Sequence, residues 1–140
     1  MIKIVLDTLI PGDIKLKMPS ASILDFNTYK IKHGIQQIVI DFLFELTKIS
    51  NNQFSRDFNE LDEDQRMKVL NVCKLKNIRL FSLFLKHVFR AYYSDKRVLS
   101  ILKVGSSPPF PDGNEIDDDD WTILLPVYER GSIYRVFDED

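Results

Sequence analysis

The feature that most constrains the fold is an apolar run over residues 75–93. Its apolar side chains recur at three- and four-residue steps, the spacing of one face of an α-helix: Ile78, Phe81, Leu85, Val88 and Tyr92. Four more widen that face: Leu80, Phe84, Phe89 and Tyr93. A helix with so little polar surface is normally covered by neighbouring elements on most sides. The run therefore predicts an all-α protein, a small helical bundle around this central helix.

Charge divides the chain of 140 residues into two parts. Residues 1–104 hold 17 basic and 11 acidic side chains, whereas residues 105–140 hold 2 and 10. We expect a helical body and a C-terminal arm of the same domain, since this length is typical of one domain. Either the acidic arm lies against its own body, or each part faces a different patch of a partner. The net charge of −2 gives no general case for binding nucleic acid.

Other apolar patterns predict the helices before the central one. One helix begins near Ile2 and stops at Pro11. Ser20 or Ser22 can cap a second one reaching Tyr29, although this segment suits an irregular structure as well. A longer amphipathic helix is expected over residues 35–49 and a polar linker over residues 50–59, with Phe54 and Phe58 anchored in the core.

Capping signals locate two further helix starts. Asp62 and Gln65 have the spacing of a capping box. Whether the helix after Asp62 breaks near Lys74 or runs into the central helix is left open by the pattern. Ser94 or Asp95 can cap a last helix, which we expect Gly105 to end in a left-handed conformation.

No residue pattern predicts a catalytic, cofactor or metal site. The glycines are scattered singly, so a phosphate-binding loop is not expected. Cys73 lies within a helical pattern and is interpreted as a buried core residue. His33 and His87 lack Cys, His or acidic residues at ligand spacing, and we assign His87 to a structural role. The acidic residues 117–120 lack the alternating ligands of a calcium loop. The isolated chain is therefore not expected to be an enzyme.

The basic line of Arg79, Lys86 and Arg90 is typical of a solvated helix face.

The N-terminal segment gives no sign of membrane insertion or export. Residues 1–10 are too short for a membrane span and lack the features of a secretory signal. We therefore expect no membrane insertion and a cytoplasmic protein, although a chain whose leader had been removed would look the same.

The C-terminal arm, residues 105–140, is Pro-rich and acidic, and we expect it to be irregular. Its large apolar groups cannot form a core of their own, so they either pack back on the helices or bind another protein, where aromatic and Arg side chains are favoured anchors. The predicted partner-binding residues are Tyr92, Tyr93, Pro108, Phe110, Trp121, Tyr128, Arg130, Tyr134 and Arg135.

Several short motifs follow one another in an order seen in a known family. They are Ile10-Pro11-Gly12-Asp13, Met18-Pro19-Ser20-Ala21, Asp41-Phe42, Phe58-Asn59-Glu60-Leu61-Asp62, Ala91-Tyr92-Tyr93-Ser94-Asp95 and Pro108-Pro109-Phe110-Pro111-Asp112-Gly113. In this order the chain resembles the gluconate 2-dehydrogenase subunit 3 family. The resemblance implies a small accessory subunit that has no cofactor and no catalytic residues of its own.

The resemblance also implies a partner. In that family the small subunit wraps a large flavin-containing oxidoreductase of the glucose–methanol–choline type, often with a cytochrome c subunit as electron acceptor. It commonly bears a twin-arginine export signal, which this sequence lacks. A periplasmic location is then expected only if a leader was removed or the partner carries the signal.

Two rival hypotheses follow from the residues. A stand-alone helical protein would bind a small apolar ligand between helices, in a pocket lined by Phe81, Phe84 and Phe89. An enzyme would need a cleft that gathers His33 or His87 with carboxylates.

Overall fold

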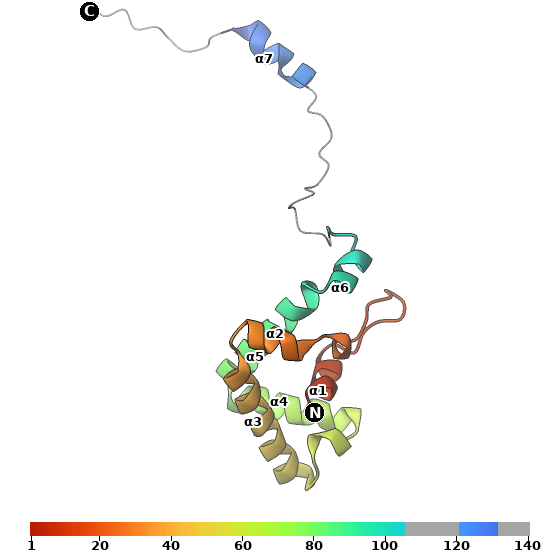
Figure 1. Ribbon diagram of the computed structural model, residues 1–140, viewed down its shortest axis with the longest axis vertical. Helices are drawn as coiled ribbons and strands as arrows, with labels where there is room; N and C mark the ends of the chain where they lie inside the picture. Colours follow the sequence, from red (N-terminus) through yellow and green to blue (C-terminus); the bar gives the residue numbers. More distant parts are fainter. Residues whose placement is uncertain (106–120, 132–140) are drawn as a thin grey trace, which may run out of the picture. The chain divides into compact units, whose positions relative to one another are not determined.

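The computed structural model describes residues 1–105 and 121–131, and the chain divides into two units, Met1–Ser107 and Pro108–Asp140. Every regular element in the described residues is a helix, which confirms the predicted all-α class (Figure 1). Each unit is treated by itself below.

The first unit opens with helix α1, Ile2–Leu9, which ends before Pro11 as predicted. The second predicted helix is split in two. A 3₁₀ turn, Ala21–Ile23, is capped by the Ser20 hydroxyl, and helix α2, Phe26–Lys32, is capped by Asp25. The split occurs because the Asp25 carboxylate accepts hydrogen bonds from the Thr28 amide (3.1 Å) and the Thr28 hydroxyl (2.6 Å).

Helix α3, Gln36–Phe54, is longer than the sequence predicted. The expected linker from residue 50 was wrong in its first five positions, which are helical. Ser50 is buried, and its hydroxyl donates to the Arg56 carbonyl at 2.5 Å, so the chain turns only after Ser55, at φ 52°. Phe58, in the 3₁₀ turn Phe58–Glu60, is fully buried as predicted, whereas Phe54 is half-buried.

Asn77 separates helix α4, Glu63–Lys76, from helix α5, Ile78–Tyr93. Its amide donates to the Cys73 carbonyl at 2.9 Å, and its side-chain oxygen accepts from the Leu80 amide at 3.1 Å. The same residue therefore ends one helix and caps the next, and the predicted start of the central helix at residue 75 was wrong. The capping box of Asp62 and Gln65 at the start of α4 is confirmed.

Helices α3, α4 and α5 pack against one another around the core. The rings of Phe42 and Phe84 stack at 3.9 Å, and the Phe26 ring meets Phe84 edge-on at 6.0 Å. The expectation that α5 is covered on most sides was wrong. One face is buried, but other apolar side chains of this helix are exposed: Ile78, Leu83, Phe89 and Tyr93.

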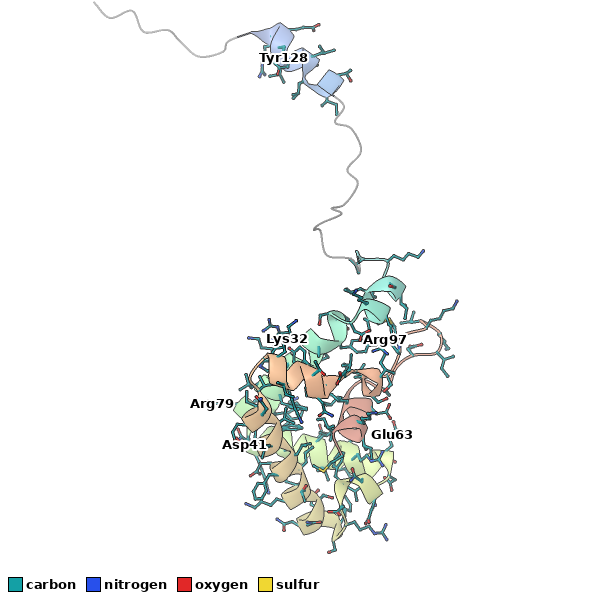
Figure 2. All side chains as sticks on the ribbon, viewed as in Figure 1. Lys32, Asp41, Glu63, Arg79, Arg97 and Tyr128 are labelled. Carbon is teal, nitrogen blue, oxygen red and sulfur yellow. The ribbon has the colours of Figure 1, made fainter. Side chains whose placement is uncertain are left out.

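Helix α6, Lys96–Ile101, begins at Asp95 as predicted. The Asp95 carboxylate accepts from the Arg97 amide and pairs with the Arg97 guanidinium at 2.7 Å. Arg97 also donates to the Ile23 carbonyl at 3.2 Å and so ties α6 to the turn before α2 (Figure 2). The predicted left-handed Gly105 was wrong, because the chain leaves the helix through Lys103, at φ 56°.

In the second unit the structure describes one helical segment, the 3₁₀ turn Trp121–Leu124 followed by helix α7, Leu125–Arg130. The expectation that the arm is irregular was wrong here. Pro126 lies in the first turn of α7, where a missing amide hydrogen costs nothing. Tyr128 and Arg130 are exposed on this helix.

The burial of Cys73 predicts a protected thiol. Burial raises the pKa of the Cys73 thiol to about 11, and the Glu45 carboxylate adds to the effect. Only the thiolate reacts readily, so native Cys73 should react with a disulfide reagent about a hundredfold more slowly than in the unfolded chain. The rate of thiol labelling would be measured at mildly alkaline pH in the native protein and in urea. Equal rates in the two conditions would contradict the described packing of Cys73.

Candidate partner-binding surface

An apolar groove lies in the first unit between the end of α1 and the end of α5. Its volume is about 340 Å³. One wall is formed by residues 9–13 and Met18, and the other by Phe89, Tyr92 and Tyr93. We refer to it as the α1–α5 groove.

Gly12 shapes the loop side of the groove. The chain turns back so that Asp13 and Met18 exchange two backbone hydrogen bonds, at 2.8 and 2.9 Å. Gly12 has φ +86°, and a Cβ there would lie 2.7 Å from the Ser20 amide nitrogen and 2.9 Å from the Met18 carbonyl oxygen. The returning backbone therefore packs directly on this residue, and only glycine leaves it room.

Tyr92 joins the loop to α5. Its ring is buried, and its hydroxyl donates to the Pro19 carbonyl at 2.6 Å, across 73 positions of sequence. Burial raises the pKa of this hydroxyl, and the charges of Tyr93 and Asp95 add to the effect, so it remains a neutral donor at ordinary pH. Tyr92 thus fixes the loop against the helix.

Phe89 and Tyr93 form the exposed rim of the groove. Their exposed fractions are 42% and 53%, and their ring centroids are 6.3 Å apart. The Tyr93 ring also meets the buried Tyr92 ring edge-on at 5.2 Å. The rim is therefore held by ring contacts while it presents apolar surface to the outside.

A tight turn, residues 13–18, begins and ends at residues that line the groove, Asp13 and Met18. Ile14 is 98% exposed and Leu16 is 67% exposed. The turn is nevertheless well tied, because the Leu16 amide donates to the Asp13 carboxylate at 2.9 Å and Lys17 adopts φ 57° to complete it. We refer to residues 13–18 as the apolar turn. It presents two large side chains in a fixed conformation that folding of the unit does not require.

The predicted partner-binding residues fall in different places. Tyr93 is exposed on the groove rim, and Tyr92 is the buried support beneath it. Tyr128 and Arg130 lie on α7 of the second unit, and Trp121 begins the 3₁₀ turn before it. Four others lie outside the described residues: Pro108, Phe110, Tyr134 and Arg135.

Sequence reasoning missed the apolar turn and the exposure of Phe89. The signal for the turn was the alternation Ile14-Lys15-Leu16-Lys17 directly after Gly12 and Asp13, which puts apolar residues where a loop is usually polar. Phe89 had no such signal, because nearly the whole of α5 is apolar.

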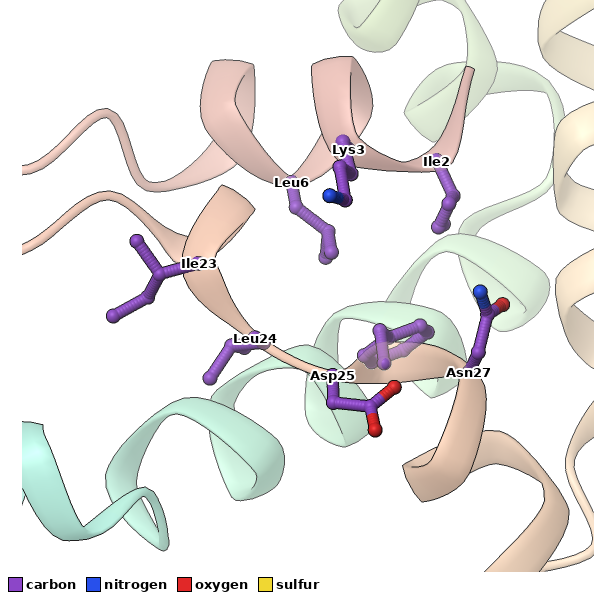
Figure 3. Close-up of a pocket in the computed structure, with 8 residues that line it drawn as sticks. Ile2, Lys3, Leu6, Ile23, Leu24, Asp25 and Asn27 are labelled. Carbon is purple, nitrogen blue, oxygen red and sulfur yellow. The ribbon is translucent and has the colours of Figure 1, made fainter.

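A second cavity, of about 280 Å³, lies between α1 and residues 23–27 (Figure 3). Lys3 and Asp25 stand on its opposite walls. The Thr28 hydroxyl, by its hydrogen bond, lowers the pKa of the Asp25 carboxyl, with smaller contributions from backbone amides and Lys3. The capping of α2 accounts for Asp25 at this position.

The rival ligand pocket lined by three phenylalanines does not form as predicted. Phe84 is fully buried against Phe42 and Phe26, and Phe81 packs at 6.0 Å from Phe42. These rings fill the core, and Phe89 lies instead on the α1–α5 groove.

Within residues 1–105 and 121–131, none of the helices is both long and apolar enough to cross a membrane. Comparisons of the chain with protein-family models, with curated proteins and with solved structures found no match.

Proposed function

We propose that this chain is a non-catalytic accessory subunit that binds and stabilises a large flavin-dependent dehydrogenase of the glucose–methanol–choline type, acting on a sugar or polyol. The α1–α5 groove and the apolar turn are its main contact surface. One observation carries the proposal: Phe89 and Tyr93 are exposed on the rim of an apolar groove whose loop side Tyr92 holds in place. Ile14 and Leu16 are exposed on the turn between Asp13 and Met18, two residues that line the same groove.

An exposed apolar surface of this kind is typical of an interaction site. Single exposed apolar residues are common, but contiguous ones beside a groove mark places where another molecule binds. Tyr and Phe are also effective anchors, because they bury a large area and lose little side-chain freedom. The hydrogen bonds of the apolar turn lower the entropic cost of binding further, since its conformation is already set.

The choice of a flavoprotein partner comes from the motifs. Three of those that carry the resemblance contribute to the groove: residues 10–13 and Met18 line its loop side, and residues 91–95 include Tyr92 and Tyr93. This accessory subunit would hold no cofactor, and a cytochrome c subunit would serve as a further member of the complex. The chain would be located in the same compartment as the partner. If the partner carries an export signal, that compartment would be the periplasm.

The exposed side chains of α7 offer a second contact in this proposal. Tyr128 and Arg130 are of the types that anchor interfaces. In the complex they would bind the large subunit apart from the groove.

The substitution Tyr93→Ala should weaken binding to the flavoprotein by more than about 1 kcal/mol, roughly a fivefold loss of affinity or more. The ring is exposed, so the fold should remain intact. Titration calorimetry with the purified flavoprotein measures the change. Phe44→Ala is the matched control, because Phe44 is 66% exposed on α3, away from the groove. Equal affinities for the two variants would contradict the assignment of the groove.

A further inference from the structure

The two histidines lie close together although 54 positions separate them. His33 follows the last residue of α2, and His87 lies in the middle of α5. Tyr29 joins them: its ring centroid is 4.2 Å from that of His33, and its hydroxyl oxygen is 3.4 Å from Nδ1 of His87. We refer to these three residues as the His–Tyr–His cluster. It lies where side chains of α2 and α5 meet, and the labels of the two helices are adjacent in Figure 1.

Cationic side chains surround this cluster. Lys86 and Arg90 flank His87 on α5, and Lys30 and Lys32 lie in the last turn of α2. Figure 2 shows Lys32 at that end of α2. Within the described part of the chain, none of these four side chains forms an ion pair.

Carboxylates on the neighbouring elements have other partners. Asp41 of α3 accepts a hydrogen bond from Gln37 at 2.8 Å. Asp25 caps α2, and Asp95 caps α6 and pairs with Arg97. The charged groups that shift the pKa of His87 are all basic side chains. Burial lowers the pKa of His87, and Arg90, His33 and Lys86 lower it further. The cluster is thus a positive site that lacks a balancing anion among the described residues.

We propose that the His–Tyr–His cluster, with Lys86 and Arg90, is a docking site for an Asp- or Glu-rich segment of a partner protein, and that it binds this segment more tightly as the pH falls. The site is separate from the α1–α5 groove and does not depend on the partner of that groove.

The exposure and charge of the site favour a peptide as the ligand. His33, Lys86 and Arg90 are exposed, so a small anion would keep most of its water and gain little. A row of carboxylates meets several of these cations at once, and its contacts reinforce one another.

The pH dependence follows from proton linkage. In the free protein the lowered pKa of His87 keeps its ring neutral at pH 7. A bound carboxylate favours the charged form of a histidine and so raises its pKa. Binding then takes up protons, and affinity must rise as the pH falls through the range below about 6.5, the ordinary histidine pKa.

The test uses the full chain and a fluorescein-labelled peptide of about ten aspartates, with an asparagine peptide of equal length as the control ligand. Fluorescence anisotropy at fixed ionic strength gives the dissociation constant at about pH 5.5 and about pH 7.5, on either side of the histidine pKa. We expect binding of the aspartate peptide alone, roughly tenfold tighter at the lower pH.

Substitutions of exposed cations distinguish binding at this site from nonspecific electrostatic binding elsewhere on the protein. Arg90→Gln and Lys86→Gln should each weaken binding about threefold or more, and His87→Gln should reduce the pH dependence. Lys68→Gln, an exposed cation on α4, is the control and should change nothing. The proposal is overturned by equal affinity at the two pH values, by equal losses in Lys68→Gln and Arg90→Gln, or by an absence of binding. Tighter binding of a single-stranded RNA oligomer than of the aspartate peptide would overturn it in favour of nucleic acid.

Discussion

Replacing Gly12 with alanine is expected to destabilise the first unit by about 2–4 kcal/mol. The positive φ of +86° strains any residue with a Cβ, and that Cβ would lie within 3.0 Å of three backbone atoms of residues 18–20. Backbone cannot move aside as a flexible side chain can, so the loop must shift away from Tyr92. Urea unfolding monitored by circular dichroism measures the loss.

Gly34→Ala is the matched control. Gly34 also has a positive φ, of +64°, but a Cβ there would have nothing within 4 Å. Only the backbone strain remains, and we expect a loss of about 1 kcal/mol. Equal losses at Gly12 and Gly34 would show that the close approach of residues 18–20 to Gly12 is not present in solution.

Phe84→Ala should cost about 3–5 kcal/mol of stability, the range expected for a fully buried phenylalanine. Phe84 is fully buried, and its ring lies between those of Phe42 and Phe26, which come from α3 and α2. Its removal leaves a cavity where three helices meet. The same urea titration measures the change.

The control for Phe84 is the Phe44→Ala variant, in which an exposed ring of α3 is removed. We expect a change within about 0.5 kcal/mol, as for most surface substitutions. A loss below about 1 kcal/mol for Phe84→Ala would contradict the described core.

Some of the features that depend on neighbours within a few positions were predicted from the sequence. Asp62 with Gln65, and Asp95 with the amide of Arg97, satisfy helix ends by contacts two or three residues away. The all-α class followed likewise from apolar spacing. The C-terminal end of α3 was harder to predict. Its last turn is fixed by the hydrogen bond from the Ser50 hydroxyl to the Arg56 carbonyl, and Arg56 lies beyond the end of the helix.

Features that depend on distant residues could not be predicted. The apolar spacing of α5 gave no reason to bury Phe84 rather than Phe89. Only the packing of the Phe84 ring against Phe42 shows that Phe84 is the buried residue of the two. The same holds for the candidate sites. Tyr93 was predicted as a contact residue, but the support of Tyr92 by Pro19 depends on a fold that brings residues 73 positions apart together.

The central claim is that the chain acts by binding a flavoprotein through the α1–α5 groove, and co-purification tests it most directly. The tagged full chain would be produced together with a flavin-dependent dehydrogenase of the proposed type, and the purified sample would be examined for a second protein and for flavin absorption. We predict a flavin-containing complex that Tyr93→Ala and Leu16→Ala weaken and Phe44→Ala preserves. Recovery of the chain alone, or of a complex that none of these substitutions affects, would contradict the claim.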